Sequence, residues 1–131
     1  MQTRPVTPAD LARSVIAVPP LARDRDLAFD PVENEKIIRH IEAGRVSTLL
    51  YGGNANFYHI APSEYESVLD QLARLAAADT LVIPSAGPAW GVMMDQAEIL
   101  AGTDYPTVMV LPHQGLTTPQ GVVAGLRRFA K

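Results

Sequence analysis

The chain has 131 residues, of which 47% are hydrophobic, and a formal net charge of −3. This length suits a single domain that buries a core. The eleven Lys and Arg residues are scattered and form no basic stripe, so we do not expect nucleic acid as a partner. No cysteine is present, which excludes disulfides, thiolate catalysis and cysteine-ligated metal sites.

The first part of the chain, residues 1–12, alternates polar side chains with prolines and contains no apolar stretch of the kind found in secretory signals. We predict an extended N-terminal segment there. No later apolar run approaches the about 20 residues that are needed to cross a membrane. We therefore expect a cytoplasmic protein without a membrane partner.

Four short runs rich in Val, Ile and Leu come next and are typical of strands that are buried on both faces. Three of the four stop at a proline, which lacks the N–H group that a strand ladder uses and so belongs at a strand end. The predicted strands are residues 14–19, 48–51, 81–84 and 107–112.

Helix-like segments lie between and after these runs, with recognisable first and last residues. Asp30, Ser63 and Thr118 are predicted N-caps, because their short side chains can accept hydrogen bonds from the free amides of a first turn. Gly44 and Gly102 lie where helices should end. Three helices carry apolar residues at helical spacing. Their faces are Val32, Ile37, Ile38 and Ile41; Val68, Leu69, Leu72, Leu75 and Ala76; and Val122, Val123, Leu126 and Phe129.

Strand and helix alternate four times without a hairpin signal, which predicts an α/β fold of four consecutive βα units with parallel strands. An open doubly wound sheet and part of a barrel both fit this pattern. In either case, functional groups should lie on the loops that leave the C-terminal ends of the strands. These loops are residues 19–30, 52–62, 84–89 and 112–118.

The second of these loops, Gly-Gly-Asn-Ala-Asn-Phe-Tyr-His at residues 52–59, has the composition of a binding site. Glycines let a ligand approach the backbone, and carboxamides beside aromatic groups can orient a small polar molecule. The alternative is a tight turn in which Asn adopts left-handed backbone angles. With one histidine from the last loop, the candidate substrate-binding residues are Gly52, Gly53, Asn54, Asn56, His59 and His113.

Other polar and aromatic residues receive structural roles. His40 lies in the first helix and is predicted to be solvated or packed, Trp90 and Met93 are predicted to pack, and Ser85 should cap a turn or line the pocket. The glycines match neither a dinucleotide-binding motif nor a phosphate-binding loop. Without paired histidines, no metal site is expected.

Three segments, in this order and spacing, resemble the dihydrodipicolinate synthase and N-acetylneuraminate lyase family. They are residues 14–20 (SVIAVPP), residues 51–65 from YGGNAN to APSEY, and residues 108–112 (VMVLP). The resemblance implies the N-terminal half of a TIM (β/α)8 barrel, because a whole barrel has about 250 residues. Members of this family bind pyruvate or a related 2-oxo acid as a Schiff base on lysine, form oligomers and need no cofactor.

The resemblance also implies a role for the second loop. The family commonly has Gly-x-Thr-Gly-Glu where this chain has Gly-Gly-Asn-Ala-Asn at residues 52–56, so the hydroxyl and the acid are absent. The amides of Gly53 and Asn54 would hold the substrate carboxylate, with the Asn54 carboxamide in place of the hydroxyl. Synthases of the family often have tyrosines where residues 112–114 read Pro-His-Gln.

The Schiff-base lysine of the family lies beyond the residues that match. Only Lys36 and Lys131 are present, and neither is placed to be a desolvated nucleophile. We therefore expect the N-terminal part of a lyase or aldolase that contributes substrate-binding loops. The alternative is a noncatalytic α/β binding or assembly module.

A half-barrel would leave two strand edges and an apolar face uncovered. Three explanations fit this expectation: the chain is a fragment of a longer enzyme, two half-barrels associate, or the sheet flattens into a flavodoxin-like domain. We therefore expect either a homo-oligomer or association with the missing half.

Overall fold

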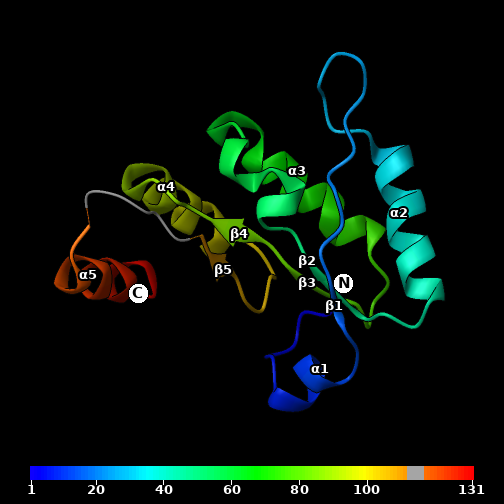
Figure 1. Cartoon of the computed structure of the whole chain (residues 1–131), viewed down its shortest axis with the longest axis horizontal. Coiled ribbons are helices and arrows are strands. Elements are labelled where there is room, and N and C mark those ends of the chain that lie inside the picture. Colours follow the sequence, from blue (N-terminus) through cyan, green and yellow to red (C-terminus); the bar gives the residue numbers. More distant parts are fainter. Residues whose placement is uncertain (112–116) are drawn as a thin grey trace.

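The computed structural model describes residues 1–111 and 117–131, and it has a mixed α/β fold with parallel strands. The helices α2 to α5 follow one another from right to left in Figure 1, with the strands between them. The helices are α1 (Pro8–Ala12), α2 (Pro31–Ala43), α3 (Pro62–Leu75), α4 (Trp90–Ala101) and α5 (Pro119–Phe129), with 3-10 turns η1 (Gly53–Ala55) and η2 (Phe57–His59). The strands are β1 (Ile16–Ala17), β2 (Thr48–Leu50), β3 (Leu81–Ile83), β4 (Ser85–Ala86) and β5 (Met109–Val110).

Each predicted strand range contains an observed strand, although the observed strands are shorter. Strands β1, β2 and β3 pair in parallel in that order, and β4 pairs in parallel with β5. The third predicted strand ends at Ile83, directly before Pro84, and a further strand that the sequence did not predict, β4, begins at Ser85 and pairs with β5. Pro84 is tolerated there because its carbonyl oxygen accepts a hydrogen bond from the Met109 N–H, and its missing N–H is not needed for that bond.

Two of the three predicted N-caps are confirmed. The Asp30 carboxylate accepts hydrogen bonds from the amides of Val32 and Glu33, and the Thr118 hydroxyl accepts one from Gly121. The Ser63 cap is wrong, because α3 begins at Pro62 and its N-cap is Ala61, two residues before Ser63. Helices α2 and α4 end at Gly44 and Gly102, as predicted.

The core lies between one face of the sheet and helices α2 and α3. Leu49, Tyr51 and Val82 are fully buried on this face. The apolar stripe of α3 packs against them, which confirms the periodicity of that helix. The buried core residues of the helices are Ile38, Tyr65, Val68, Leu69 and Leu72.

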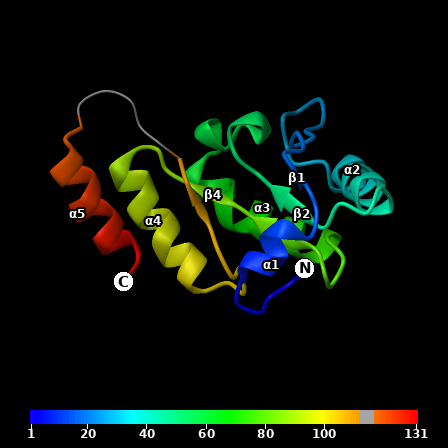
Figure 2. The same cartoon turned by 60° about the horizontal axis from the view of Figure 1, so that its bottom comes forward.

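The opposite face of the sheet is buried at Thr48 and Leu81 and becomes exposed towards its edge strand β1. Residues that are directly paired in parallel strands share a face, so Ile16, Thr48 and Leu81 form a row there. Ile16 at the edge of this row is 44% exposed. The apolar face of α5 is also largely exposed, since α5 packs at the end of the molecule beside α4 (Figure 2).

The N-terminal segment is not extended throughout, because residues 8–12 form α1, which Thr7 caps. The Gln2 N–H donates a hydrogen bond to the Thr80 carbonyl oxygen, which ties the segment to the residue before β3. Within residues 1–111 and 117–131, no helix combines the length and apolarity needed to cross a membrane.

Candidate functional site

The C-terminal ends of the strands meet at one edge, where the second and third loops lie side by side. Leu50 pairs with Ile83, and the Tyr51 N–H donates to the Ile83 carbonyl oxygen at 2.9 Å, so the pairing continues beyond β2. The same register brings Gly52 opposite Ser85, and Ser85 pairs with Met109. Gly52 directly after β2, Ser85 in β4 and Met109 in β5 therefore form one row at this edge.

The second loop consists of the two 3-10 turns joined by Asn56. Asn56 has φ 57°, in the left-handed region, and its carbonyl oxygen accepts a hydrogen bond from the His59 N–H at 2.8 Å. Asparagine tolerates this conformation better than most residues. The alternative interpretation of the loop is therefore right about the backbone of Asn56, which reverses the chain between the turns.

The remaining candidate residues of this loop lie on its surface or directly beneath it. Gly53, Asn54 and His59 are exposed, whereas Gly52 is buried. The amides of Gly53 and Asn54 donate no hydrogen bond to any described residue. The loop thus presents two backbone donors, a carboxamide and an imidazole together. His113 lies outside the described residues.

Aromatic packing fixes the loop from below. Ala55 and Phe57 are buried, and the Phe57 ring lies 6.2 Å from the rings of both Tyr51 and Tyr65, measured between centroids. The Tyr65 hydroxyl donates to the Ser85 carbonyl oxygen at 2.9 Å, which links α3 to β4. Burial raises the pKa of both tyrosines, so their phenols stay protonated at neutral pH.

A side chain at Gly52 would crowd its neighbours unless Met109 moved aside. A Cβ atom at this position would lie 2.6 Å from Cε of Met109 and 3.5 Å from Oγ of Ser85. Ser85 is buried, and its hydroxyl has no hydrogen-bond partner among the described residues. Ser85 therefore faces the interior beside Gly52, close to the second loop.

An ion pair that the sequence did not reveal joins the first loop to the first turn of α3, directly after the second loop. Arg23 donates two hydrogen bonds to the Glu64 carboxylate, at 2.9 and 2.6 Å, and a third to the Leu27 carbonyl oxygen at 2.6 Å. Glu64 also accepts from the Ala61 N–H at 3.2 Å. The hydrogen bonds from Arg23 lower the pKa of Glu64, despite its partial burial, so the carboxylate is ionised at neutral pH. These residues are 41 apart, and no sequence signal connects them.

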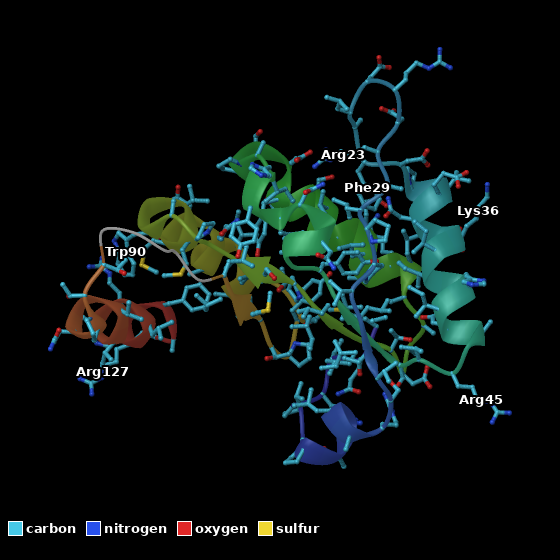
Figure 3. The ribbon with its side chains drawn as sticks, in the orientation of Figure 1. Arg23, Phe29, Lys36, Arg45, Trp90 and Arg127 are labelled. Carbon is cyan, nitrogen blue, oxygen red and sulfur yellow. The ribbon has the colours of Figure 1, made fainter. Side chains whose placement is uncertain are left out.

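Lys36 lies away from the strand ends on the outer side of α2 (Figure 3). Its ammonium group lies 2.6 Å from the Glu33 carboxylate, and this hydrogen bond raises the pKa of Lys36. Lys131 is exposed after α5, and His40 is exposed on α2. Neither lysine is therefore desolvated in the described structure, as expected from the sequence.

Met93 packs as predicted, but Trp90 is far more exposed than its predicted packing role implies. Met93 is buried, whereas Trp90 is 47% exposed and lies between α4 and α5, where its ring contacts Gly125 (Figure 3). Two open hollows of about 310 and 320 Å³ occur elsewhere, and neither includes a residue of loop 52–61. The described residues contain no cluster of three or more His, Asp or Glu able to hold a metal ion.

No protein-family model matches the chain, and no curated protein matches it significantly. Solved structures that resemble it include two dihydrodipicolinate synthases. Dihydrodipicolinate synthase from Bacillus clausii has a TM-score of 0.76 and 19% identity, over 93% of this chain and 43% of that protein. Dihydrodipicolinate synthase from Rhodopseudomonas palustris has a TM-score of 0.71 and 18% identity, over 88% of this chain and 38% of that protein. The chain thus shares the fold of these enzymes and spans less than half of their length.

Proposed function

We propose that this chain is the N-terminal part of a Schiff-base lyase or aldolase that acts on pyruvate or a related 2-oxo acid. It contributes substrate-binding loops, and the catalytic lysine comes from outside these residues. The main support is the loop after β2. In a fold that resembles dihydrodipicolinate synthase over 93% of the chain, this loop presents two amides that are not bonded to any described residue.

The chemistry of the loop suits a small carboxylate. A carboxylate oxygen accepts hydrogen bonds from closely spaced backbone amides, and Gly53 and Asn54 supply two in succession. The Asn54 carboxamide and the His59 imidazole are exposed beside them and can bind further oxygen atoms of the ligand. In this proposal Gly52 and Asn56 shape the loop, and His113, which lies outside the described residues, is a further candidate contact.

The attacking amine cannot be Lys36. A Schiff base forms from a neutral amine, which requires a lysine whose pKa is lowered by desolvation or by nearby positive charge. The pKa of Lys36 is shifted in the opposite direction, because Glu33 binds its ammonium group. We therefore assign the amine to a second half-barrel that covers the exposed face around Ile16, contributed either by further chain or by an associating protein.

Borohydride trapping with pyruvate tests this proposal, because reduction converts a lysine imine into a stable adduct that intact-mass spectrometry detects. We expect no adduct on these 131 residues alone and one adduct on any longer natural product that contains them. An adduct on neither protein would overturn imine chemistry.

The noncatalytic module is retained as the second candidate, because both lysines lie away from the loop. NMR titration with pyruvate separates the candidates. Shifts of the Gly53 and Asn54 amides favour the enzyme part, and their absence favours the module.

A further inference from the structure

Ser85 buries a hydroxyl group that has no partner among residues 1–111 and 117–131. The residue is 1% exposed, and its Oγ makes no hydrogen bond to any described residue. A buried hydroxyl without a hydrogen bond costs stability, whereas alanine at the same position would avoid this cost. A ligand would supply the missing partner.

The position of Ser85 favours a ligand over a structural explanation. Ser85 lies in the row of residues at the C-terminal edge of the strands, between Gly52 and Met109. Its Oγ is on the same side as the missing Cβ of Gly52, from which it would be 3.5 Å away. Gly52 is directly followed by the two free amides of the second loop. A small molecule bound by those amides would therefore approach Ser85 from the side of Gly52.

Met109 covers this position in the described structure. Its Cε would lie 2.6 Å from a Cβ at Gly52, so the methyl group occupies the space that glycine leaves empty. The Met109 side chain is only partly buried, and a methionine has three rotatable bonds with low energy differences between rotamers. The methyl group can swing away without movement of the backbone, which would open the space between Gly52 and Ser85.

We propose that Ser85 is a substrate-binding residue whose hydroxyl donates a hydrogen bond to a carboxylate or keto oxygen of a short 2-oxo acid, after the Met109 side chain moves aside. This inference rests on the proposed function and adds a contact from β4 to the loop after β2. It also assigns a purpose to glycine at position 52, since any side chain there would stand between the ligand and Ser85.

Thr48 provides a matched control within the same sheet. Its hydroxyl is also buried and without a partner among the described residues. Thr48 shares the face of Gly52 but precedes it by four residues in β2, which corresponds to about 13 Å along a strand. A ligand at the second loop cannot reach Thr48, so its hydroxyl should not affect binding.

The test compares the 131-residue chain with its Ser85→Ala and Thr48→Val variants by NMR titration and thermal unfolding. Pyruvate, lactate and propionate serve as probes. We expect pyruvate to shift the Ser85 amide resonance of the wild type, and Ser85→Ala to weaken binding about three- to tenfold. Thr48→Val should leave the Kd unchanged. Both variants should unfold at a higher temperature without ligand, because each removes an unpaired hydroxyl.

The possible outcomes separate this inference from the proposed function. Equal pyruvate affinity of Ser85→Ala and wild type would overturn the role of Ser85 and leave the 2-oxo acid proposal in place. Binding of lactate or propionate but not pyruvate, weakened by Ser85→Ala, would support Ser85 and overturn the 2-oxo acid. No shift of the Ser85 amide with any probe, or a lower unfolding temperature of Ser85→Ala, would overturn the role of Ser85.

Discussion

At the scale of single residues, Arg23 and Glu64 connect the first loop to the first turn of α3, 41 residues away. Their paired hydrogen bonds and the Ala61 N–H hold the end of the second loop against the first. Both side chains are less than one-third exposed, at 26% and 29%. Two parallel hydrogen bonds with partial burial make this pair stronger than an ordinary surface ion pair.

We expect Glu64→Gln to lower the free energy of unfolding by about 1 to 2 kcal/mol at neutral pH. Because Arg23 lowers the pKa of Glu64 in the folded protein, the ionised carboxylate is favoured by folding. The difference between wild type and variant should therefore be constant above the ordinary pKa of 4.5 and shrink as the pH falls through the lower folded value. Urea unfolding at a series of pH values measures this difference.

Glu66→Gln is the control for Glu64→Gln. Glu66 is exposed on the same helix and makes no ion pair with a described residue. Its substitution should change stability by less than about 0.5 kcal/mol. A pH-independent effect of Glu64→Gln, or an equal effect of Glu66→Gln, would show that the ion pair does not stabilise the loops.

Gly52 and Met109 should be energetically coupled. Gly52→Ala places a methyl group at the position of Met109 Cε, and overpacking of this kind costs about 1 to 3 kcal/mol. In a Met109→Ala background the clash is absent, so the same substitution should cost less by about 1 kcal/mol or more. A double-mutant cycle on unfolding free energies measures this coupling. Additive effects would mean that Met109 does not occupy the space beside Gly52.

At the scale of elements, local rules predicted starts and ends better than they predicted the extent of the strands. Asp30 and Thr118 cap helices because capping depends on a few adjacent residues. The Ser63 prediction failed because the Glu64 carboxylate instead accepts from the Ala61 N–H, which makes Ala61 the N-cap, two residues before Ser63. Strand β4 was not predicted, because the sequence does not show with which strand the residues after Pro84 pair.

The candidate site was predictable only in part, for the same reason. The glycines and carboxamides at residues 52–56 are contiguous and follow a strand, so composition alone identified the loop. Ser85 and Met109 meet Gly52 through strand register, and Arg23 meets Glu64 across 41 residues. Such contacts between distant residues become visible only when the strands are placed side by side.

The contact between α4 and α5 depends on the ring of Trp90, the only tryptophan in the chain. A Cβ at Gly125 would lie 2.8 Å from Cζ3 of this ring. We expect Gly125→Ala to displace the ring and to shift its fluorescence emission towards that of exposed tryptophan. The helix-propensity gain of about 1 kcal/mol from glycine to alanine should be lost to this clash.

Gly91 is the matched control for Gly125, because a Cβ there meets nothing within 4 Å. Gly91→Ala should raise the free energy of unfolding by up to about 1 kcal/mol and leave the emission of Trp90 unchanged. Equal stabilisation by both substitutions would show that the ring does not pack on α5.

At the scale of the whole molecule, helices α2 and α3 cover one face of the sheet, and the other face is buried at Thr48 and Leu81 but open at its edge. At this edge Ile16 is 44% exposed on strand β1, which pairs with no described strand on its outer side. The apolar residues of α5 are exposed as well. Together they form the kind of apolar surface and open strand edge through which chains associate.

We expect the isolated chain to self-associate through this face, and Ile16→Glu to lower the association constant by at least about tenfold, because burial of an unpaired carboxylate is costly. Sedimentation velocity over a wide range of protein concentration measures the constant. Leu27→Glu is the control, since Leu27 is 72% exposed but lies in the loop after β1, away from the sheet face. A wild-type chain that stays monomeric at all these concentrations would show that this face does not mediate self-association. If both substitutions weaken association equally, the contact between chains depends on charge or on the first loop. The proposal of a second half-barrel would then lose its main physical support.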